Sequence, residues 1–189
     1  MKKRLKDTLK QCLLDLDGVL ADFNLGWHRL NHLPNAYANP ENHGIYDLTD
    51  IYNMSLDNFW KGLNKDFFAE LPKTQEADEL VEFLIDTFGV QNITILSSPP
   101  HGYPCAMEGK VLWVNKHFPM LKSFLFGSRK RLCSGHGRVL IDDFDKHIKE
   151  FNAGGGHGIL VPRPWNSGFQ QHTATLEVVK ANVYHVFNQ

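Results

Sequence analysis

The sequence predicts a doubly wound α/β fold with a parallel sheet, because short apolar segments alternate with segments of helical periodicity. Each apolar segment ends at turn formers or acidic residues, as buried strands do. The expected strands are residues 11–16, 92–96, 123–126, 138–141 and 158–161, and the expected helices are residues 76–88, 106–118 and 144–153. Ligands bind at the carboxyl ends of the strands in such a sheet, so the functional residues should follow the strands.

The first expected strand ends in two carboxylates, Asp15 and Asp17, and then in Gly18. Residues two apart on a strand leave the same side, so the two carboxylates can converge on one site. They would repel each other unless a cation or a proton lay between them, which indicates Mg²⁺. A solvated Asp-Gly turn is the simpler alternative for this pair alone.

Polar residues also follow two later strands. Ser97 and Ser98 come after residues 92–96, where hydroxyl and backbone N–H groups could hold a phosphate oxygen, although Ser-Ser-Pro by itself is more typical of an ordinary loop. Asp142 and Asp143 end the strand at residues 138–141. Adjacent acids at the end of an apolar segment again favour a metal site.

A basic segment, residues 128–131, lies between these signals and contains Lys130 and Arg131. It fits a solvated turn, a small nucleic-acid patch or a cation that faces a phosphoryl group. The chain has a formal net charge of −1, with 20 Lys and Arg against 21 Asp and Glu. Without a global basic field, we expect no binding of long nucleic acid.

The composition fits a water-soluble chain, since 42% of the residues are hydrophobic and no apolar run approaches the roughly 20 residues of a membrane span. The basic start, residues 1–6, resembles that of a signal peptide, but Asp15 and Asp17 interrupt the apolar stretch behind it. We therefore expect a cytoplasmic protein. Three widely spaced cysteines without a CxxC pair predict neither a disulfide framework nor a zinc site.

The stretch from about residue 24 to residue 73 breaks the alternation of strands and helices, being rich in Asn, His, Pro and aromatic residues. We interpret it as a small, mainly helical cap inserted after the first motif. The core domain would then comprise residues 1–23 and 74–189. Residues 161–166, which follow the last expected strand, either line the rim of the site or form a proline-stiffened surface loop.

The order of the four polar signals resembles the four motifs of the haloacid dehalogenase (HAD) superfamily. Within it, the segments DLDGVLADF at residues 15–23, ILSSP at residues 95–99 and LIDD at residues 140–143 are similar to the 5′(3′)-deoxyribonucleotidases, including bacterial and phage versions. The resemblance covers nearly the whole chain and is weakest in the insertion. It implies a Mg²⁺-dependent phosphomonoesterase that hydrolyses (deoxy)nucleoside monophosphates through an aspartyl phosphate.

The resemblance also implies residue roles. Asp15 attacks phosphorus, Asp17 protonates the leaving alcohol and later activates water, and Ser97 and Lys130 hold the phosphate, with Arg131 as the alternative cation. Asp15, the backbone carbonyl of Asp17 and an acid of the Asp142-Asp143 pair bind Mg²⁺, and Asp143 is favoured as the direct ligand.

The cap should then select the substrate, with Phe23, Trp27, Phe59 and Trp60 as candidates for stacking on a nucleobase, although aromatic residues in a small helical cap more often form its core. A HAD phosphatase for another small phosphate ester or a nucleic-acid end, and a non-catalytic HAD-like binding module, are the alternatives. The partner would be a small-molecule nucleotide, without a membrane, and a homodimer is compatible with the sequence. Base preference, sugar selectivity and oligomeric state are not specified.

Overall fold

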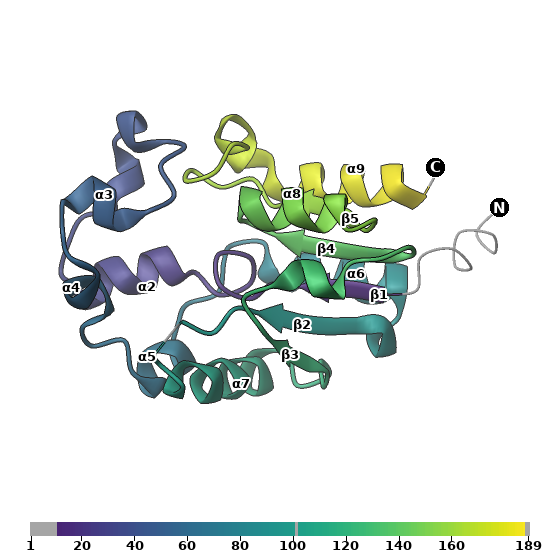
Figure 1. The fold of residues 1–189 in the computed structure, drawn as a ribbon, viewed down its shortest axis with the longest axis horizontal. Helices are drawn as coiled ribbons and strands as arrows, with labels where there is room; N and C mark the ends of the chain where they lie inside the picture. Colours follow the sequence, from purple (N-terminus) through teal and green to yellow (C-terminus); the bar gives the residue numbers. More distant parts are fainter. Residues whose placement is uncertain (1–10, 101, 188–189) are drawn as a thin grey trace.

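The computed structural model describes residues 11–100 and 102–187, so the basic start at residues 1–6 lies outside the described residues. Five parallel strands form one sheet with the order β3-β2-β1-β4-β5 (Figure 1). The strands are β1 (Gln11–Leu14), β2 (Ile93–Ser97), β3 (Phe124–Phe126), β4 (Arg138–Asp142) and β5 (His157–Leu160). Each of the five predicted strand segments overlaps one of them, and the predicted parallel α/β fold is confirmed.

Helices cover both faces of the sheet, as the doubly wound prediction requires (Figure 1). The predicted helices correspond within one residue at each end to α6 (Ala77–Phe88), α7 (Cys105–His117) and α8 (Asp145–Ala153). The C-terminal helix α9 (Thr175–Phe187) was not predicted from the sequence. Single 3₁₀ turns complete the core at Val90–Asn92, Lys130–Cys133 and Phe169–Ala174.

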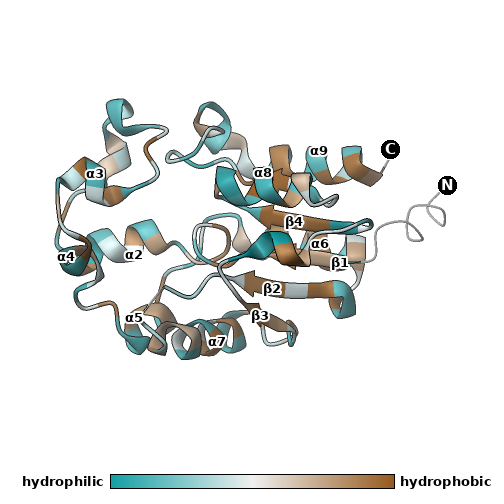
Figure 2. Cartoon of the chain, viewed as in Figure 1, coloured by the Kyte–Doolittle hydropathy of each residue, from teal (hydrophilic) through white to brown (hydrophobic). Residues whose placement is uncertain are grey.

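The strands bury alternate residues on opposite faces. Cys12 and Leu14 of β1 belong to the larger core cluster, together with apolar residues of α6, α7 and α9. Leu13 points to the other face, where it packs with Phe151 of α8. Because both faces of the central strands are buried, β1, β2 and β4 are mainly apolar, and brown predominates in β2 and β4 in Figure 2.

The segment between β1 and α6 lies beyond the carboxyl ends of the strands (Figure 1). It contains α2 (Phe23–Leu30), α3 (Leu48–Tyr52), α4 (Leu56–Trp60), α5 (Lys65–Ala69) and 3₁₀ turns at Ala36–Ala38 and Pro40–Asn42. Helix α5 packs closely on α7. The two helices approach so closely at Gly109 that an added Cβ would lie 2.3 Å from the carbonyl oxygen of Lys65. The division into a core at residues 1–23 and 74–189 and a cap at residues 24–73 stays a prediction.

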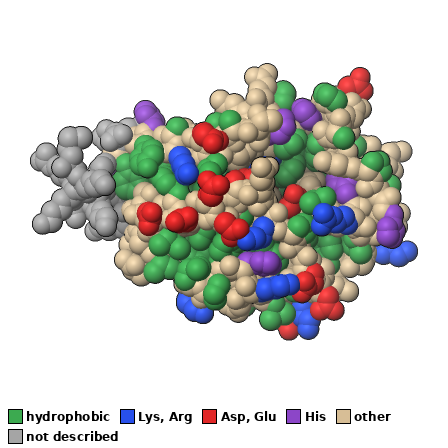
Figure 3. All heavy atoms as spheres, turned by 180° about the vertical axis from the view of Figure 1, so that it is seen from behind, with side chains coloured by type: hydrophobic (Ala, Val, Ile, Leu, Met, Phe, Trp, Pro, Cys, Tyr) green, Lys and Arg blue, Asp and Glu red, His purple; other side chains and the backbone are tan. Residues whose placement is uncertain are grey.

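The described part of the chain contains no helix that is both long and apolar enough to cross a membrane. On the face shown in Figure 3, Lys and Arg side chains are scattered among Asp and Glu. This mixed charge agrees with the small net charge of the sequence.

Candidate active site

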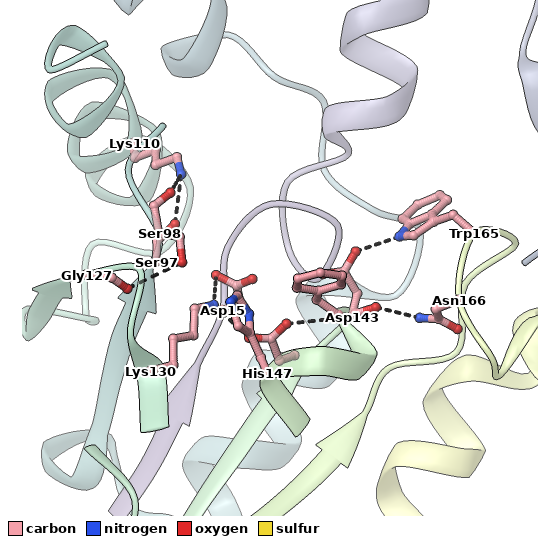
Figure 4. Close-up of polar contacts among 12 residues, drawn as sticks. Asp15, Ser97, Ser98, Lys110, Gly127, Lys130, Asp143, His147, Trp165 and Asn166 are labelled. Carbon is pink, nitrogen blue, oxygen red and sulfur yellow. Dashed lines mark hydrogen bonds and ion pairs between the residues drawn. The ribbon is translucent and has the colours of Figure 1, made fainter. Parts of the chain in front are cut away.

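The predicted site residues come together at the carboxyl end of the sheet (Figure 4). Asp15 directly follows β1, Ser97 ends β2, Asp142 ends β4, and Lys130 begins the 3₁₀ turn between β3 and β4. Since β2, β1 and β4 are neighbours, their ends lie side by side and bring residues that are distant in sequence into contact.

Lys130 lies between two carboxylates. Its Nζ is 2.8 Å from Oδ1 of Asp15 and 2.7 Å from Oδ2 of Asp142, and its side chain is fully buried. Burial alone would lower the pKa of Lys130, but the two carboxylates outweigh that effect and raise the pKa. Arg131, the alternative cation of the sequence analysis, is exposed. Lys130 is therefore the cation that the fold places beside Asp15.

Asp142 and Asp143 have different partners. Oδ2 of Asp142 also lies 3.0 Å from Nδ1 of His147, and its Oδ1 accepts a hydrogen bond from the backbone N–H of Phe144 at 2.9 Å. Oδ2 of Asp143 accepts a hydrogen bond from Nε1 of Trp165 at 2.7 Å. Both oxygens of Asp142 are thus engaged by protein donors, whereas Asp143 has one oxygen bound to Trp165.

Three buried carboxylates form a candidate metal site, because one oxygen from each of Asp15, Asp142 and Asp143 lies within 4.8 Å of the others. Burial raises the pKa of Asp15 to about 6, against the opposing effect of Lys130. Burial and the neighbouring acids Asp142 and Asp15 raise the pKa of Asp143 well above its usual value. The three acids are compensated incompletely by one lysine, so this oxygen-only donor set fits a hard divalent cation.

Asp17 belongs to a second polar network that was not predicted. Its Oδ2 lies 2.8 Å from Nζ of Lys110, a lysine of α7, and the same Nζ donates to Oγ of Ser97 at 2.9 Å and to the carbonyl of Ser98 at 3.0 Å. Oδ1 of Asp17 is buried and has no hydrogen-bond partner among the described residues. The sequence did hold a signal for Lys110, since it stands on the same helical face as Ala106, Trp113 and Val114.

The loop after β5 forms part of the site, as one of the two interpretations of residues 161–166 expected. Arg163 is buried, and its Nε donates to the carbonyl of Gly18 at 2.6 Å. Asn166 donates to the backbone carbonyl of Asp143 at 2.8 Å. The loop thereby ties the turn after β1 to the end of β4.

Gly18 permits this close approach. Its φ is +75°, and an added Cβ would lie 2.1 Å from Oδ2 of Asp143. Any other residue would therefore displace a candidate metal ligand and strain the turn.

A pocket of about 340 Å³ opens beside these residues. Asp17, Ser98 and Asp143 line its polar end. The rest of its wall is largely apolar and aromatic, with Phe23, Tyr46, Leu56, Phe59, Trp60, Phe68 and Trp165. A pocket with acids at one end and rings at the other can hold a ligand that carries a phosphate on a flat apolar group.

The aromatic candidates of the sequence analysis divide into two kinds. Phe23, Phe59 and Trp60 line the pocket. Trp27 does not: its side chain is fully buried, its ring stacks on Phe59 at 5.3 Å, and its Nε1 donates to the carbonyl of Phe59, so the structure favours the alternative that it forms part of the core of the cap over stacking on a base. Trp27 is turned toward the protein interior and packs on Phe59, so it supports the position of the Phe59 ring.

The parallel α/β fold, with its site at the carboxyl ends of the strands, is of the HAD type. A solved structure of the HAD-hydrolase YfnB from Bacillus subtilis, described as bound to magnesium, is similar with a TM-score of 0.58 and 14% identity over 97% of this chain and 100% of that chain. A phosphonoacetaldehyde hydrolase like protein from Oleispira antarctica matches at a TM-score of 0.47, with 13% identity over 97% of this chain and 86% of the other. No match was found among curated proteins.

The sequence shows the family to which the chain belongs. The model of the family described as 5′ nucleotidase, deoxy (pyrimidine), cytosolic type C protein matches residues 10–182, and the chain belongs to this family. It is therefore a phosphoric monoester hydrolase of the nucleotidase type, which confirms the predicted enzyme class.

Proposed function

We propose that the protein hydrolyses deoxynucleoside monophosphates with Mg²⁺ and that Asp15 is the nucleophile. The observation that carries the proposal is the position of Asp15, held by Lys130 at 2.8 Å at the end of β1 and grouped with Asp142 and Asp143. A carboxylate fixed in this way is a nucleophile that needs no separate base once it is ionised.

The reaction then has two displacements. An oxygen of Asp15 forms a bond to phosphorus, the ester P–O bond breaks, and the leaving oxygen takes a proton from Asp17. Next, Asp17 removes a proton from a water molecule, the water oxygen bonds to phosphorus, and the bond between phosphorus and Asp15 breaks. Phosphate is released, and both aspartates return to their starting states.

The contacts of Asp17 support its role as acid and base. Lys110 holds Oδ2, whereas Oδ1 has no partner among the described residues, and Asp17 lines the pocket. One oxygen is thus fixed in position, and the other is not committed to a protein donor, so the carboxyl group can exchange a proton with the leaving group.

The serines have different tasks in this proposal. Oγ of Ser97 accepts a hydrogen bond from Lys110, so its own hydroxyl proton remains available for a phosphate oxygen. The hydroxyl of Ser98 donates to the carbonyl of Gly127 at 3.3 Å, which orients the loop after β2. Lys130 would stabilise the negative charge that the transferring group carries.

Asp15 and Asp143 are the residues that would bind Mg²⁺ directly, together with the carbonyl of Asp17. Asp142 is better placed to support the site, because its oxygens are engaged by Lys130, His147 and the backbone of Phe144. The bound ion would supply positive charge for the phosphoryl oxygens.

The aromatic wall of the pocket, with Phe23, Phe59 and Trp60, would accept the nucleoside. The proposed cap supplies most of this wall, so it would determine the substrate. The family description supports a preference for deoxyribose. A cytoplasmic location agrees with that description, and a homodimer stays a prediction.

A substrate panel tests the proposal. Turnover of 5′- and 3′-monophosphates of deoxynucleosides and ribonucleosides should be compared with that of glucose 6-phosphate and a 3′-phosphorylated oligonucleotide, with Mg²⁺ and with EDTA. We expect the highest kcat/KM for pyrimidine deoxynucleotides and loss of activity in EDTA. Equal kcat/KM for dUMP and UMP would contradict the sugar preference, and better turnover of the sugar phosphate or the oligonucleotide would contradict the substrate class.

A further inference from the structure

Asn24 brings an amide into a pocket wall that is otherwise largely apolar. It occupies the first turn of α2, next to Phe23, and it lines the pocket together with Phe59 and Trp60. Its Oδ1 is buried and accepts no hydrogen bond from any described residue. Among the described residues, the only other side-chain atom in this condition is Oδ1 of Asp17, which faces the same pocket.

A buried carbonyl oxygen without a partner lowers the stability of a folded protein, because the oxygen loses its hydrogen bonds to water and gains none. The backbone carbonyl of Asn24 does have a partner, since Nδ1 of His28 lies 2.6 Å from it. The backbone carbonyl at this position is therefore satisfied, whereas the side-chain carbonyl is not. The outer torsion of an asparagine side chain is soft, so a donor in the pocket can draw the oxygen toward itself.

We infer that Asn24 determines specificity by accepting a hydrogen bond from the nucleoside part of the substrate. The inference rests on the proposed nucleotidase function. Two nucleoside groups can donate, a hydroxyl of the deoxyribose and the N–H of a pyrimidine base. Asn24 stands at the start of the helix that follows the catalytic turn, and it lines the same pocket as Asp17 and the aromatic residues Phe59 and Trp60.

The inference predicts a substrate-dependent loss. Asn24→Leu and Asn24→Ala should lower kcat/KM for dTMP about tenfold more than they lower kcat/KM for p-nitrophenyl phosphate, which has no nucleoside; this ratio corresponds to about 1.4 kcal/mol. Two replacements are needed because leucine keeps the volume and alanine keeps the pocket open. Asn31 provides the matched control, since it ends the same helix and its Nδ2 donates to the carbonyl of Trp27 away from the pocket. Asn31→Ala should lower the thermal midpoint and leave the ratio of the two kcat/KM values as in the wild type.

Substrate analogues identify the donor. The wild type and Asn24→Ala should be compared on dTMP, on 2′,3′-dideoxythymidine monophosphate and on N3-methyl-dTMP. Replacing dTMP by the analogue that lacks the true donor should lower kcat/KM of the wild type about tenfold. The same replacement should leave kcat/KM of Asn24→Ala unchanged, because the interaction is already absent in the variant.

The outcomes separate this inference from the proposed function. If the wild type hydrolyses p-nitrophenyl phosphate but no nucleoside monophosphate, both are wrong. If the wild type hydrolyses dTMP and the Asn24 variants lose equal factors on dTMP and p-nitrophenyl phosphate, or lose nothing, only the role of Asn24 is wrong. The role of Asn24 would also be wrong if each analogue lowered kcat/KM by the same factor in the wild type and in Asn24→Ala.

Discussion

Nζ of Lys110 lies 2.8 Å from Oδ2 of Asp17 and 2.9 Å from Oγ of Ser97, so one buried lysine joins the first motif of the chain to the loop after β2. Lys110 comes from the middle of α7 and is 1% exposed. A lysine buried to this extent is unusual without a function, because its charge must be compensated by a partner. Asp17 is the residue that compensates it, and Lys110 in turn positions Asp17.

Lys110→Met should therefore lower both stability and activity. Removing one partner of a buried pair leaves the other uncompensated and typically costs about 3–5 kcal/mol, and the partial exposure of Asp17 places the expected loss toward the lower end. Lys116→Met on the same helix is the control, because Lys116 forms an exposed ion pair with Glu70, and water and salt screen such a pair so that it contributes little to stability. Urea unfolding of both variants measures the difference. Similar losses in the two variants would contradict the role of Lys110.

Lys130 and Arg131 test the assignment of the phosphate cation. Lys130 is buried between Asp15 and Asp142, whereas Arg131 is exposed. Lys130→Met should lower kcat by about 10²-fold or more, as the loss of a preorganised electrostatic group does. Arg131→Met should remain close to the wild type. Steady-state kinetics with p-nitrophenyl phosphate, combined with circular dichroism to confirm folding, compares the two. A crippled Arg131 variant would show that the loop between β3 and β4 rearranges on binding.

The stability of the metal-free protein should depend on pH through Asp15. Its pKa is about 6 in the folded protein, whereas an aspartate in an unfolded chain titrates near about 4. Between these values the folded state binds more protons than the unfolded state, so the free energy of unfolding falls as the pH rises from about 4 to about 6. The Asp15→Asn variant has no ionisable group at this position, so this contribution to the fall in its free energy of unfolding should be absent. In EDTA the variant should be more stable than the wild type at about pH 7, and the difference should vanish near about pH 4.

Mg²⁺ provides the internal control for that experiment. A cation bound by Asp15 and Asp143 stabilises the ionised carboxylates, so saturating Mg²⁺ should raise the thermal midpoint of the wild type and raise that of Asp15→Asn less. Wild-type protein that is as stable as the variant in EDTA at about pH 7 would show that Lys130 alone compensates Asp15.

The fold could be predicted from the sequence because its signals are local. The apolar segments that became β1, β2 and β4 are buried on both faces and therefore read as continuous hydrophobic runs, and the acids and serines at their ends were visible as breaks in those runs. Helix α9 was missed because its pattern is weak, with Val179 and Val183 as its fully buried apolar residues.

Contacts between distant residues could not be predicted in the same way. Arg163 reaches Gly18 across 145 positions, and nothing in the composition of residues 161–166 shows which backbone carbonyl it binds. The role of Trp27 was left open in the sequence analysis for a related reason. Its position in an aromatic-rich insertion did not show which face of α2 would be turned inward, and the packing against Phe59 decides that it is buried.

The two aspartates of the first motif should be separable by their leaving-group dependence. Asp15→Asn should be inactive on every substrate, because the nucleophile is absent. Asp17→Asn should depend on the substrate, since the alkoxide of a nucleoside monophosphate needs a proton to leave, whereas p-nitrophenolate is stable enough to leave without one. The first displacement of Asp17→Asn should therefore be much slower with dTMP than with p-nitrophenyl phosphate.

The second displacement extends this prediction, because hydrolysis of the aspartyl phosphate still requires Asp17 as the base. Asp17→Asn should release p-nitrophenol in a burst of about one equivalent per enzyme and then turn over slowly as the intermediate accumulates. The variant retains Lys110 and Ser97 but removes the carboxylate that compensates the charge of Lys110. Rapid-quench kinetics of both variants on both substrates is the decisive measurement. A burst from Asp15→Asn, or an equal loss of first-turnover rate on the two substrates in Asp17→Asn, would require the two roles to be reassigned.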